Sequence, residues 1–468
     1  MKQTRAMRIP SHTPAIAVLA ILALSAIDVG AQTPANLNAL QGLAPVSALG
    51  NTTAGKAALA ANLAVTGAIQ DGTAGQPTLL PFADQQQQAL RDAFITRGNA
   101  CQLADGFGST LGGSYQSLTN CISPDDDKSL TDISPAIAQL VAYASATTGS
   151  DSESGKFFFA DATLHAKEPA STAAMAILRE IDGTEDIFGK TYGLPAGSKG
   201  ADLHGNSRPF QTEPHLVTFE GKDFFGMSSG NIAYLRGPAQ DLTDSPSYPS
   251  GHTTYGYTDG LLLALLVPDR YPQMVTRAAE YGNDRIIMGA HYAMDVLAGR
   301  TLAAFDLAQL LANKPAYVGL KRRGIDIDDF YQALVVARTD LTKALEAHCG
   351  QSVPACALQD HGRFADAAKN HDFYAVTQTY GLPVVFAQTA SGAEDVARLA
   401  PEAGYLLTAA FPYLTLAQAD DILTATEGPG GGFLDNGSAF GVYSRIDLYR
   451  AAEKAIAAAP PTQRAAAR

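Results

Sequence analysis

The stretch that decides the fold reads Pro249-Ser250-Gly251-His252 and continues into a long apolar run, Thr253–Leu266. A run of this length and composition predicts a buried helix. The first backbone N–H groups of a helix lack intrahelical acceptors, and together with the helix dipole they attract anions. Gly251 lets the backbone come close to an anion, Ser250 adds a hydroxyl donor, and His252 is placed to act as a general acid. The competing interpretation is an ordinary helix-capping Ser beside an uninvolved His.

A second polar group follows in His291-Tyr-Ala-Met-Asp295, and Arg285 lies six residues before this histidine. A helix over His291–Leu311 would place His291 and Asp295 on one face. The carboxylate would then fix the imidazole tautomer and leave the other ring nitrogen free to attack. A turn near Gly289 would bring Arg285 to the same place, where a guanidinium suits capture of a tetrahedral oxyanion. Taken singly, each residue also fits an ordinary surface position.

Arg208-Pro209 lies about 40 residues before the first motif and supplies a second guanidinium on a backbone that proline restricts. A phosphate site that needs no metal ion can be made from two guanidiniums, a helix N-terminus, one imidazole that acts as general acid and one that acts as nucleophile. The order and spacing of the whole set therefore predict phosphate chemistry, although no fragment does so alone.

With these motifs the chain resembles the PAP2 superfamily, which includes class A bacterial acid phosphatases and vanadium-dependent haloperoxidases. The family pattern is Lys-x6-Arg-Pro, then Pro-Ser-Gly-His, then Ser-Arg-x5-His-x3-Asp, and the resemblance covers roughly residues 170–313. It implies that His291 is the phosphohistidine nucleophile, that Asp295 orients it, and that His252 protonates the leaving group. The other matched positions would hold the phosphate oxygens: Arg208, Arg285, Ser250 and the Gly251 amide.

Two positions depart from the family pattern. Asp284 stands where the family has the Ser before its second Arg, so one hydrogen bond to the anion is missing or replaced. The family Lys would fall at Ala201, whereas the nearest lysine is Lys199, with eight residues instead of six between it and Arg208. Glycines around Lys199 predict a loop, from which this lysine is a candidate phosphate ligand.

The expected fold is all-α, a helical bundle of the PAP2/haloperoxidase type with an additional, mostly helical C-terminal region. Helical periodicity begins at Ile133, and a capping box at Thr415-Leu-Ala-Gln418 predicts a late helix. Residues 32–80 read as a loosely ordered lead-in with room for a short helix around Ala57–Val65, and 216–248 as an irregular connection. The predicted organisation is a signal peptide at 1–31, an N-terminal region with a low-complexity lead-in at 32–130, a PAP2-type phosphatase domain at 131–315 and a C-terminal helical region at 316–468.

The first residues predict export. A basic start precedes the apolar core Ala15–Ile27, and Val29-Gly30-Ala31 offers small residues for cleavage. The apolar core has 13 residues, fewer than the roughly 20 that a membrane span needs. We therefore expect a periplasmic or secreted protein that is not stably inserted in a membrane after cleavage.

The four cysteines fit an oxidising compartment. Pairing each with its neighbour gives Cys101–Cys121 and Cys349–Cys356, one of three connectivities. Neither pair has zinc spacing, so a structural role is expected. The net charge of −13 argues against a nucleic-acid partner, because the chain offers no broad basic face.

The main functional hypothesis is an exported, metal-independent acid phosphatase that hydrolyses small phosphomonoesters and needs no cofactor. The first alternative is a vanadate-dependent haloperoxidase, in which the same pocket holds vanadate with His291 as axial ligand; the displaced lysine weighs towards the phosphatase. The second alternative is a catalytically silent binding or scaffold protein, against which the intact His252, His291 and Asp295 argue. The sequence leaves homo-oligomerisation and the leaving group open.

Overall fold

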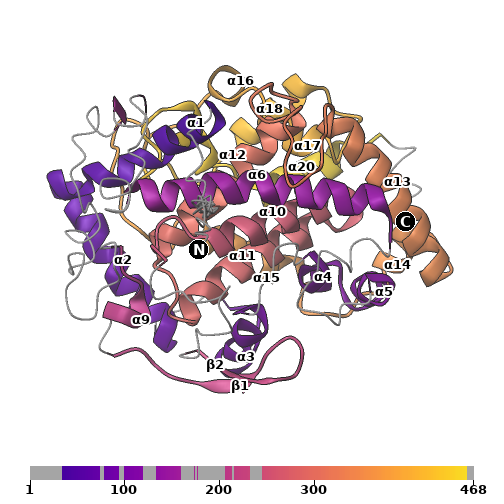
Figure 1. Cartoon of the computed structure of the whole chain (residues 1–468), viewed down its shortest axis with the longest axis horizontal. Coiled ribbons are helices and arrows are strands. Elements are labelled where there is room, and N and C mark those ends of the chain that lie inside the picture. Colours follow the sequence, from indigo (N-terminus) through magenta and orange to yellow (C-terminus); the bar gives the residue numbers. More distant parts are fainter. Residues whose placement is uncertain are drawn as a thin grey trace, which may run out of the picture.

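A computed structural model describes residues 34–73, 78–93, 100–119, 133–159, 206–212, 215–231 and 245–460, together with residues 173, 176 and 177. These parts of the chain are helical apart from one short antiparallel hairpin, so the expected all-α class is confirmed (Figure 1). None of the helices in these ranges is both long enough and apolar enough to cross a membrane.

The helices that precede residue 160 come first. They are α1 (Pro34–Leu43), η1 (Ala44–Asn51), α2 (Thr53–Asp71), α3 (Phe82–Ala93), α4 (Ala100–Leu103), η2 (Ala104–Phe107), α5 (Ser109–Thr119) and α6 (Pro135–Phe159). In Figure 1, α6 runs across the width of the molecule, with α1 and α2 towards one end. The helical periodicity read from Ile133 onwards is confirmed by α6.

The middle of the chain holds α9 (Pro209–Thr212), β1 (Glu220–Lys222), β2 (Ser228–Gly230), α10 (Gly251–Leu266), η6 (Pro268–Arg270), α11 (Tyr271–Ile287) and α12 (Ala293–Leu311). Helix α10 is central and packs on α6, α11 and α12. It is buried on nearly every face, as expected of a helix that is apolar all round. Its glycines allow this approach, because a Cβ on Gly256 would lie 2.2 Å from the ring of Tyr281 in α11.

The expectation of a loosely ordered lead-in is wrong for residues 34–73, although the short helix considered around Ala57–Val65 does form, as part of α2. The Ala- and Leu-rich composition of this segment forms α1 and α2, whose apolar residues are buried in the common core. Two polar side chains of α2 bind the first turn of α12: the Thr66 hydroxyl accepts from the Ala293 N–H at 3.0 Å, and the Asn62 carbonyl accepts from the Met294 N–H at 2.9 Å. Small residues that looked featureless in sequence therefore serve close helix packing and helix capping.

The connection at 216–248 is partly regular. Strands β1 and β2 pair antiparallel, with Gly221 opposite Ser229, and Gly226 in the tight turn between them has φ +76°. The hairpin lies against α3 (Figure 1). An irregular connection was therefore only partly the right expectation.

The C-terminal region consists of α13 (Phe330–Cys349), α14 (Val353–Ala357), α15 (Ala367–Thr377), α16 (Val396–Leu399), α17 (Tyr405–Thr408), α18 (Leu416–Thr426), α19 (Ala439–Tyr443) and α20 (Leu448–Ala458). The expected helical extension is confirmed, and Thr415 with Gln418 forms the predicted capping box of α18. The region packs on α6, α11 and α12, and one cluster of buried side chains extends from Ala35 to Ala455. The domain boundaries remain predictions.

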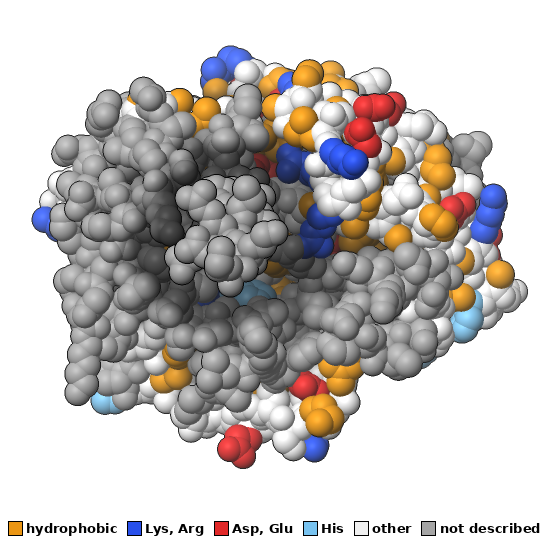
Figure 2. Space-filling model, viewed as in Figure 1, with side chains coloured by type: hydrophobic (Ala, Val, Ile, Leu, Met, Phe, Trp, Pro, Cys, Tyr) orange, Lys and Arg blue, Asp and Glu red, His pale blue; other side chains and the backbone are white. Residues whose placement is uncertain are grey.

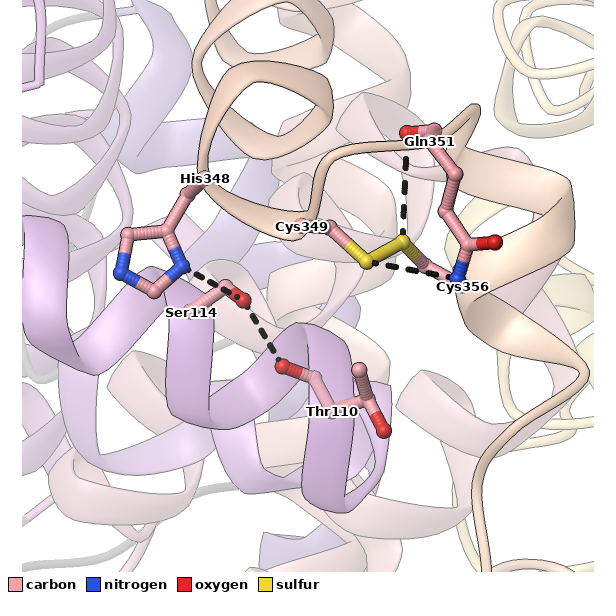
Figure 3. The surroundings of a disulfide bond; sticks show 6 residues. All are labelled: Thr110, Ser114, His348, Cys349, Gln351 and Cys356. Carbon is pink, nitrogen blue, oxygen red and sulfur yellow. Dashed lines mark hydrogen bonds between the residues drawn. A yellow bond between two sulfur atoms is a disulfide. The ribbon is translucent and has the colours of Figure 1, made fainter.

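The predicted Cys349–Cys356 disulfide is confirmed and joins the end of α13 to α14 (Figure 3). Beside it, Nδ1 of His348 lies 3.0 Å from the Ser114 hydroxyl, which donates to the Thr110 carbonyl at 2.9 Å. The bridge thus lies where α13 meets α5. The other predicted bridge involves Cys121, which lies outside the described residues.

Candidate active site

Ser250 caps the N-terminus of α10. Its hydroxyl oxygen accepts from the Thr253 N–H at 3.1 Å, and the hydroxyl donates to the Thr253 side-chain oxygen at 2.8 Å. Its own N–H donates to the carbonyl of Asp295 at 3.0 Å, which ties this helix end to α12. Ser250 is therefore an N-cap in this structure, and its role as a phosphate donor remains a prediction. Gly251 follows as the first helical residue.

The segment between α11 and α12 turns as predicted, with Gly289 at φ +71°. The N–H groups of Ala290 and His291 both donate to the carbonyl of Arg285, at 3.1 and 3.3 Å. The expected helix start at His291 is wrong, because the N-cap of α12 is Tyr292 in extended conformation. His291 therefore projects from a turn, and its placement relative to Asp295 does not follow from a shared helical face.

Asp295 contacts His291 largely through a second side chain, that of Ser247. Its Oδ2 accepts from the Tyr292 N–H at 2.9 Å and from the Ser247 hydroxyl at 2.5 Å. Nδ1 of His291 is 3.5 Å from that oxygen and 3.3 Å from the Ser247 hydroxyl. Since Ser247 donates to the carboxylate, its oxygen is left to accept from an Nδ1–H. This network assigns the proton to Nδ1 and leaves a lone pair on Nε2.

Arg208 faces that lone pair. Its Nη1 lies 2.9 Å from Nε2 of His291 and also donates to the carbonyl of Ala290 at 3.0 Å. Nε and Nη2 donate to the carbonyls of Ser245 and Pro246, at 2.8 and 3.2 Å. The guanidinium is fully buried, and carbonyls from either side of the site fix its plane.

His252 completes the pair of imidazoles. Its ring centroid lies 6.5 Å from that of His291. Burial lowers the pKa of both histidines well below the usual value, and the nearby cations Arg208, Arg285 and Lys156 lower it further. Both imidazoles are therefore neutral at neutral pH while the site holds no anion. A dianion would offset the cations and favour the protonated form of His252.

The structure thus brings together most of the residues singled out in the sequence, with Arg285 in the last turn of α11. Asp284, the departure beside it, instead accepts from the Gln85 amide of α3 at 2.8 Å. Burial raises the pKa of the Asp284 carboxyl well above its usual value, and the neighbouring Asp92 and Glu280 raise it further. Lys199 lies outside the described residues.

Sequence reasoning missed two residues of this neighbourhood, Ser247 and Lys156. Ser247 stands two residues before Pro249, and this adjacency to the motif was the available signal. Lys156 lies in α6, far from every motif in the chain, and the sequence offered only a lone cation near the end of a long apolar helix.

Figure 2 shows Lys or Arg side chains, in blue, and a His side chain, in pale blue, on one face of the molecule. Positive charge at a surface favours the approach of anions.

Arg208 belongs to the first motif of the family pattern and His291 to the last, and the structure places their side chains in contact. Residues 205–313 match the PAP2 superfamily model. The PAP2 match covers α9 to α12 and includes every histidine and arginine of the site discussed above. The lysine of α6 lies outside it.

Curated relatives of this PAP2 segment are named as phosphatases. An acid phosphatase of Zymomonas mobilis is 37% identical over 105 residues, which cover 22% of this chain and 34% of that protein. A non-specific acid phosphatase of Salmonella typhimurium is 44% identical over 69 residues, 15% of this chain and 28% of that protein. One of Providencia stuartii is 28% identical over 142 residues, 28% of this chain and 56% of that protein. The chain thus spans between about a quarter and just over half of the length of these relatives.

Proposed function

We propose that the protein is an exported acid phosphatase that hydrolyses phosphomonoesters through a phosphohistidine on His291. The observation that carries the proposal is the placement of the His291 ring: Nε2 lies 2.9 Å from Arg208, and Nδ1 lies 3.3 Å from the Ser247 hydroxyl that donates to Asp295. The PAP2 match and the relatives named acid phosphatases support the same chemistry. Export rests on residues 1–31, which lie outside the described residues.

In the first step a substrate phosphoryl group enters between Arg208 and His291, and the guanidinium transfers its hydrogen bond from Nε2 to a phosphate oxygen. Nε2 attacks phosphorus and forms the P–N bond while the bond from phosphorus to the leaving oxygen breaks. His252 gives its proton to that oxygen and becomes neutral. Arg208 and Arg285 stabilise the charge on the equatorial oxygens.

In the second step a water molecule attacks the phosphohistidine. Neutral His252 takes the proton of the water, the P–N bond breaks, and inorganic phosphate forms. The electron pair returns to Nε2 of His291. Side-chain cations supply the positive charge throughout, so the proposed reaction needs no metal ion.

The decisive variant is His291→Ala, assayed with p-nitrophenyl phosphate. We expect turnover to fall about a thousandfold or more, because the nucleophile is removed. His371→Ala is the matched control, since that imidazole also lies beside a carboxylate, 3.3 Å from Asp372, but outside the site. Turnover of His291→Ala close to that of the wild type would refute the proposal. Halogenation of a dye with orthovanadate and peroxide would favour the haloperoxidase alternative instead.

A further inference from the structure

Lys156 lies beside the anion site although it comes from a distant part of the chain. It sits in the last turn of α6, only 7% exposed, and lies 49 residues before the PAP2 segment begins at residue 205. Helix α6 packs directly on α10 and α12, which border the site. The packing of α6 therefore places this side chain near His252 and His291.

The contacts of Lys156 place it against two parts of the site. Its Nζ donates to the Pro246 carbonyl at 2.8 Å, and the same carbonyl accepts from Nη2 of Arg208 at 3.2 Å. On the other side, a Cβ built on Gly251 would lie 3.1 Å from Cε of Lys156 and 3.8 Å from Nζ. The ammonium thus lies between the guanidinium and the N-terminus of α10, the two groups expected to hold phosphate oxygens.

The electrostatic environment of Lys156 is unfavourable for a cation without a bound anion. Burial lowers its pKa well below the usual value, and repulsion from Arg208 and Arg285 adds to this, against attraction from Asp295 and Glu153. Within the described chain the Pro246 carbonyl is its one hydrogen-bond partner, whereas an ammonium has three N–H donors. A buried amine among cations keeps its proton only when an anion compensates the charge, so a bound anion would favour the ammonium form of Lys156.

We propose that Lys156 is a phosphate-binding residue whose Nζ donates to an oxygen of the substrate phosphoryl group. Helix α6 then completes the anion site with a residue from outside the PAP2 segment. This inference rests on the proposed function, because it assumes that the site binds phosphate. The competing role is purely structural: a tie from α6 to the loop at Pro246.

The test is the equilibrium binding of inorganic phosphate, measured by calorimetry on wild type, Lys156→Met and Lys156→Arg. Loss of a charge-assisted hydrogen bond should weaken binding about tenfold or more in Lys156→Met. Lys156→Arg should recover part of the loss, since it restores a cationic donor. In turnover assays KM should rise in the Met variant. A structural tie would lower the thermal midpoint without changing the phosphate Kd of the folded protein.

Lys369→Met is the matched control, because Lys369 also donates to a single backbone carbonyl, that of Leu79 at 2.6 Å, but lies at an exposed position outside the site. Phosphate affinity should be unchanged there. A wild-type phosphate Kd in folded Lys156→Met would overturn the inference. Weakened binding in Lys199→Met, with Lys156→Met unaffected, would also overturn it and assign the role to the loop lysine.

If Lys156→Met does not fold, the wild-type protein with 15N at lysine Nζ gives a second measurement. Inorganic phosphate should shift one lysine resonance that is missing from the spectrum of Lys156→Arg; no shift of that resonance overturns the inference. The two proposals fail in different ways. Active His291→Ala contradicts the phosphatase mechanism, whereas unaltered phosphate binding in Lys156→Met alongside inactive His291→Ala contradicts only the role of Lys156.

Discussion

At the scale of single residues, the contact between Arg208 and His291 determines how the proposed nucleophile would be released. Nη1 of Arg208 lies 2.9 Å from Nε2, so this ring nitrogen is covered by the guanidinium. A tetrahedral anion that enters the site offers the guanidinium better acceptors than a neutral ring nitrogen. Under the proposed function, binding of the phosphoryl group would therefore free Nε2 of His291 for attack.

Ser247 is the residue whose loss should uncouple Asp295 from His291. In Ser247→Ala the Asp295 carboxylate loses the hydrogen bond from Ser247 and retains the one from the Tyr292 N–H. The Nδ1–H of His291 loses the Ser247 oxygen, its acceptor at 3.3 Å. We expect kcat to fall about ten- to a hundredfold, the effect of one hydrogen bond to a charged group. The measurement is kcat and KM for p-nitrophenyl phosphate across pH.

Ser114→Ala is the matched control for this variant. Ser114 likewise lies between an imidazole, that of His348, and an oxygen to which it donates, the Thr110 carbonyl, but at the contact of α5 with α13 (Figure 3). Its removal should leave kcat unchanged. Equal losses in the two serine variants would mean that the effect of Ser247→Ala is a general one on folding.

At the scale of elements, the site depends on how closely α12 approaches the N-terminus of α10. A Cβ on Gly299 would lie 2.6 Å from the Ser250 carbonyl oxygen and 3.1 Å from the Thr253 Cβ. The first distance is shorter than packed atoms tolerate and involves backbone, so Gly299→Ala must push the two helices apart. We expect the free energy of unfolding to fall by about 1–3 kcal/mol. We also expect kcat/KM to fall, because Ser250 and Asp295 separate.

Gly67→Ala in α2 is the control for this substitution. A Cβ there would meet no atom within 4 Å, so it should stabilise the protein by about 0.5–1 kcal/mol through helix propensity alone. Urea unfolding and p-nitrophenyl phosphate turnover report the two quantities. Unchanged activity and stability in Gly299→Ala would contradict the close packing described for α10 and α12.

The same elements show what the sequence predicts and what it does not. The apolar run after Pro249 and the turn before His291 follow from local composition, so α10 and the 288–292 turn were predictable. The start of α12 was not, because the Tyr292 N–H binds a side chain of its own first turn. The position of Lys156 depends on how α6 crosses α10, a long-range packing that hydrophobic periodicity along one helix does not contain.

At the scale of the whole molecule, buried carboxyl groups link stability to pH. Asp259 in α10 is fully buried; it accepts from the Ser145 hydroxyl at 2.9 Å, and its Oδ2 has no hydrogen-bond partner among the described residues. Burial raises the pKa of Asp259 to about 7, and that of Asp151 in α6 also to about 7. Such carboxyls are protonated in the folded chain at pH values where the unfolded chain has released the proton.

The sign of the effect follows from proton binding. Between the unfolded pKa of about 4 and the folded pKa of about 7, the native state holds more protons, so the stability from Asp259 is full at acidic pH and is lost as pH rises through 7. The free energy of unfolding of wild type minus that of Asp259→Asn should fall by about 4 kcal/mol over this window. Urea titrations at several pH values measure it. Asp326→Asn, at an exposed position, controls for the general loss of one charge. A pH-independent difference for Asp259→Asn would contradict the prediction.

The hydrogen bonds from the first turn of α12 to side chains of α2 limit how far the chain can be shortened. Residues 205–313 look like a portable catalytic unit because they carry the similarity to other proteins. Excised, they would leave the Ala293 and Met294 amides without the acceptors that α2 provides, at about 1–3 kcal/mol for each buried donor left unsatisfied. The excised piece would also lack the ammonium of α6. We therefore expect residues 205–313 alone to be too short to form the site.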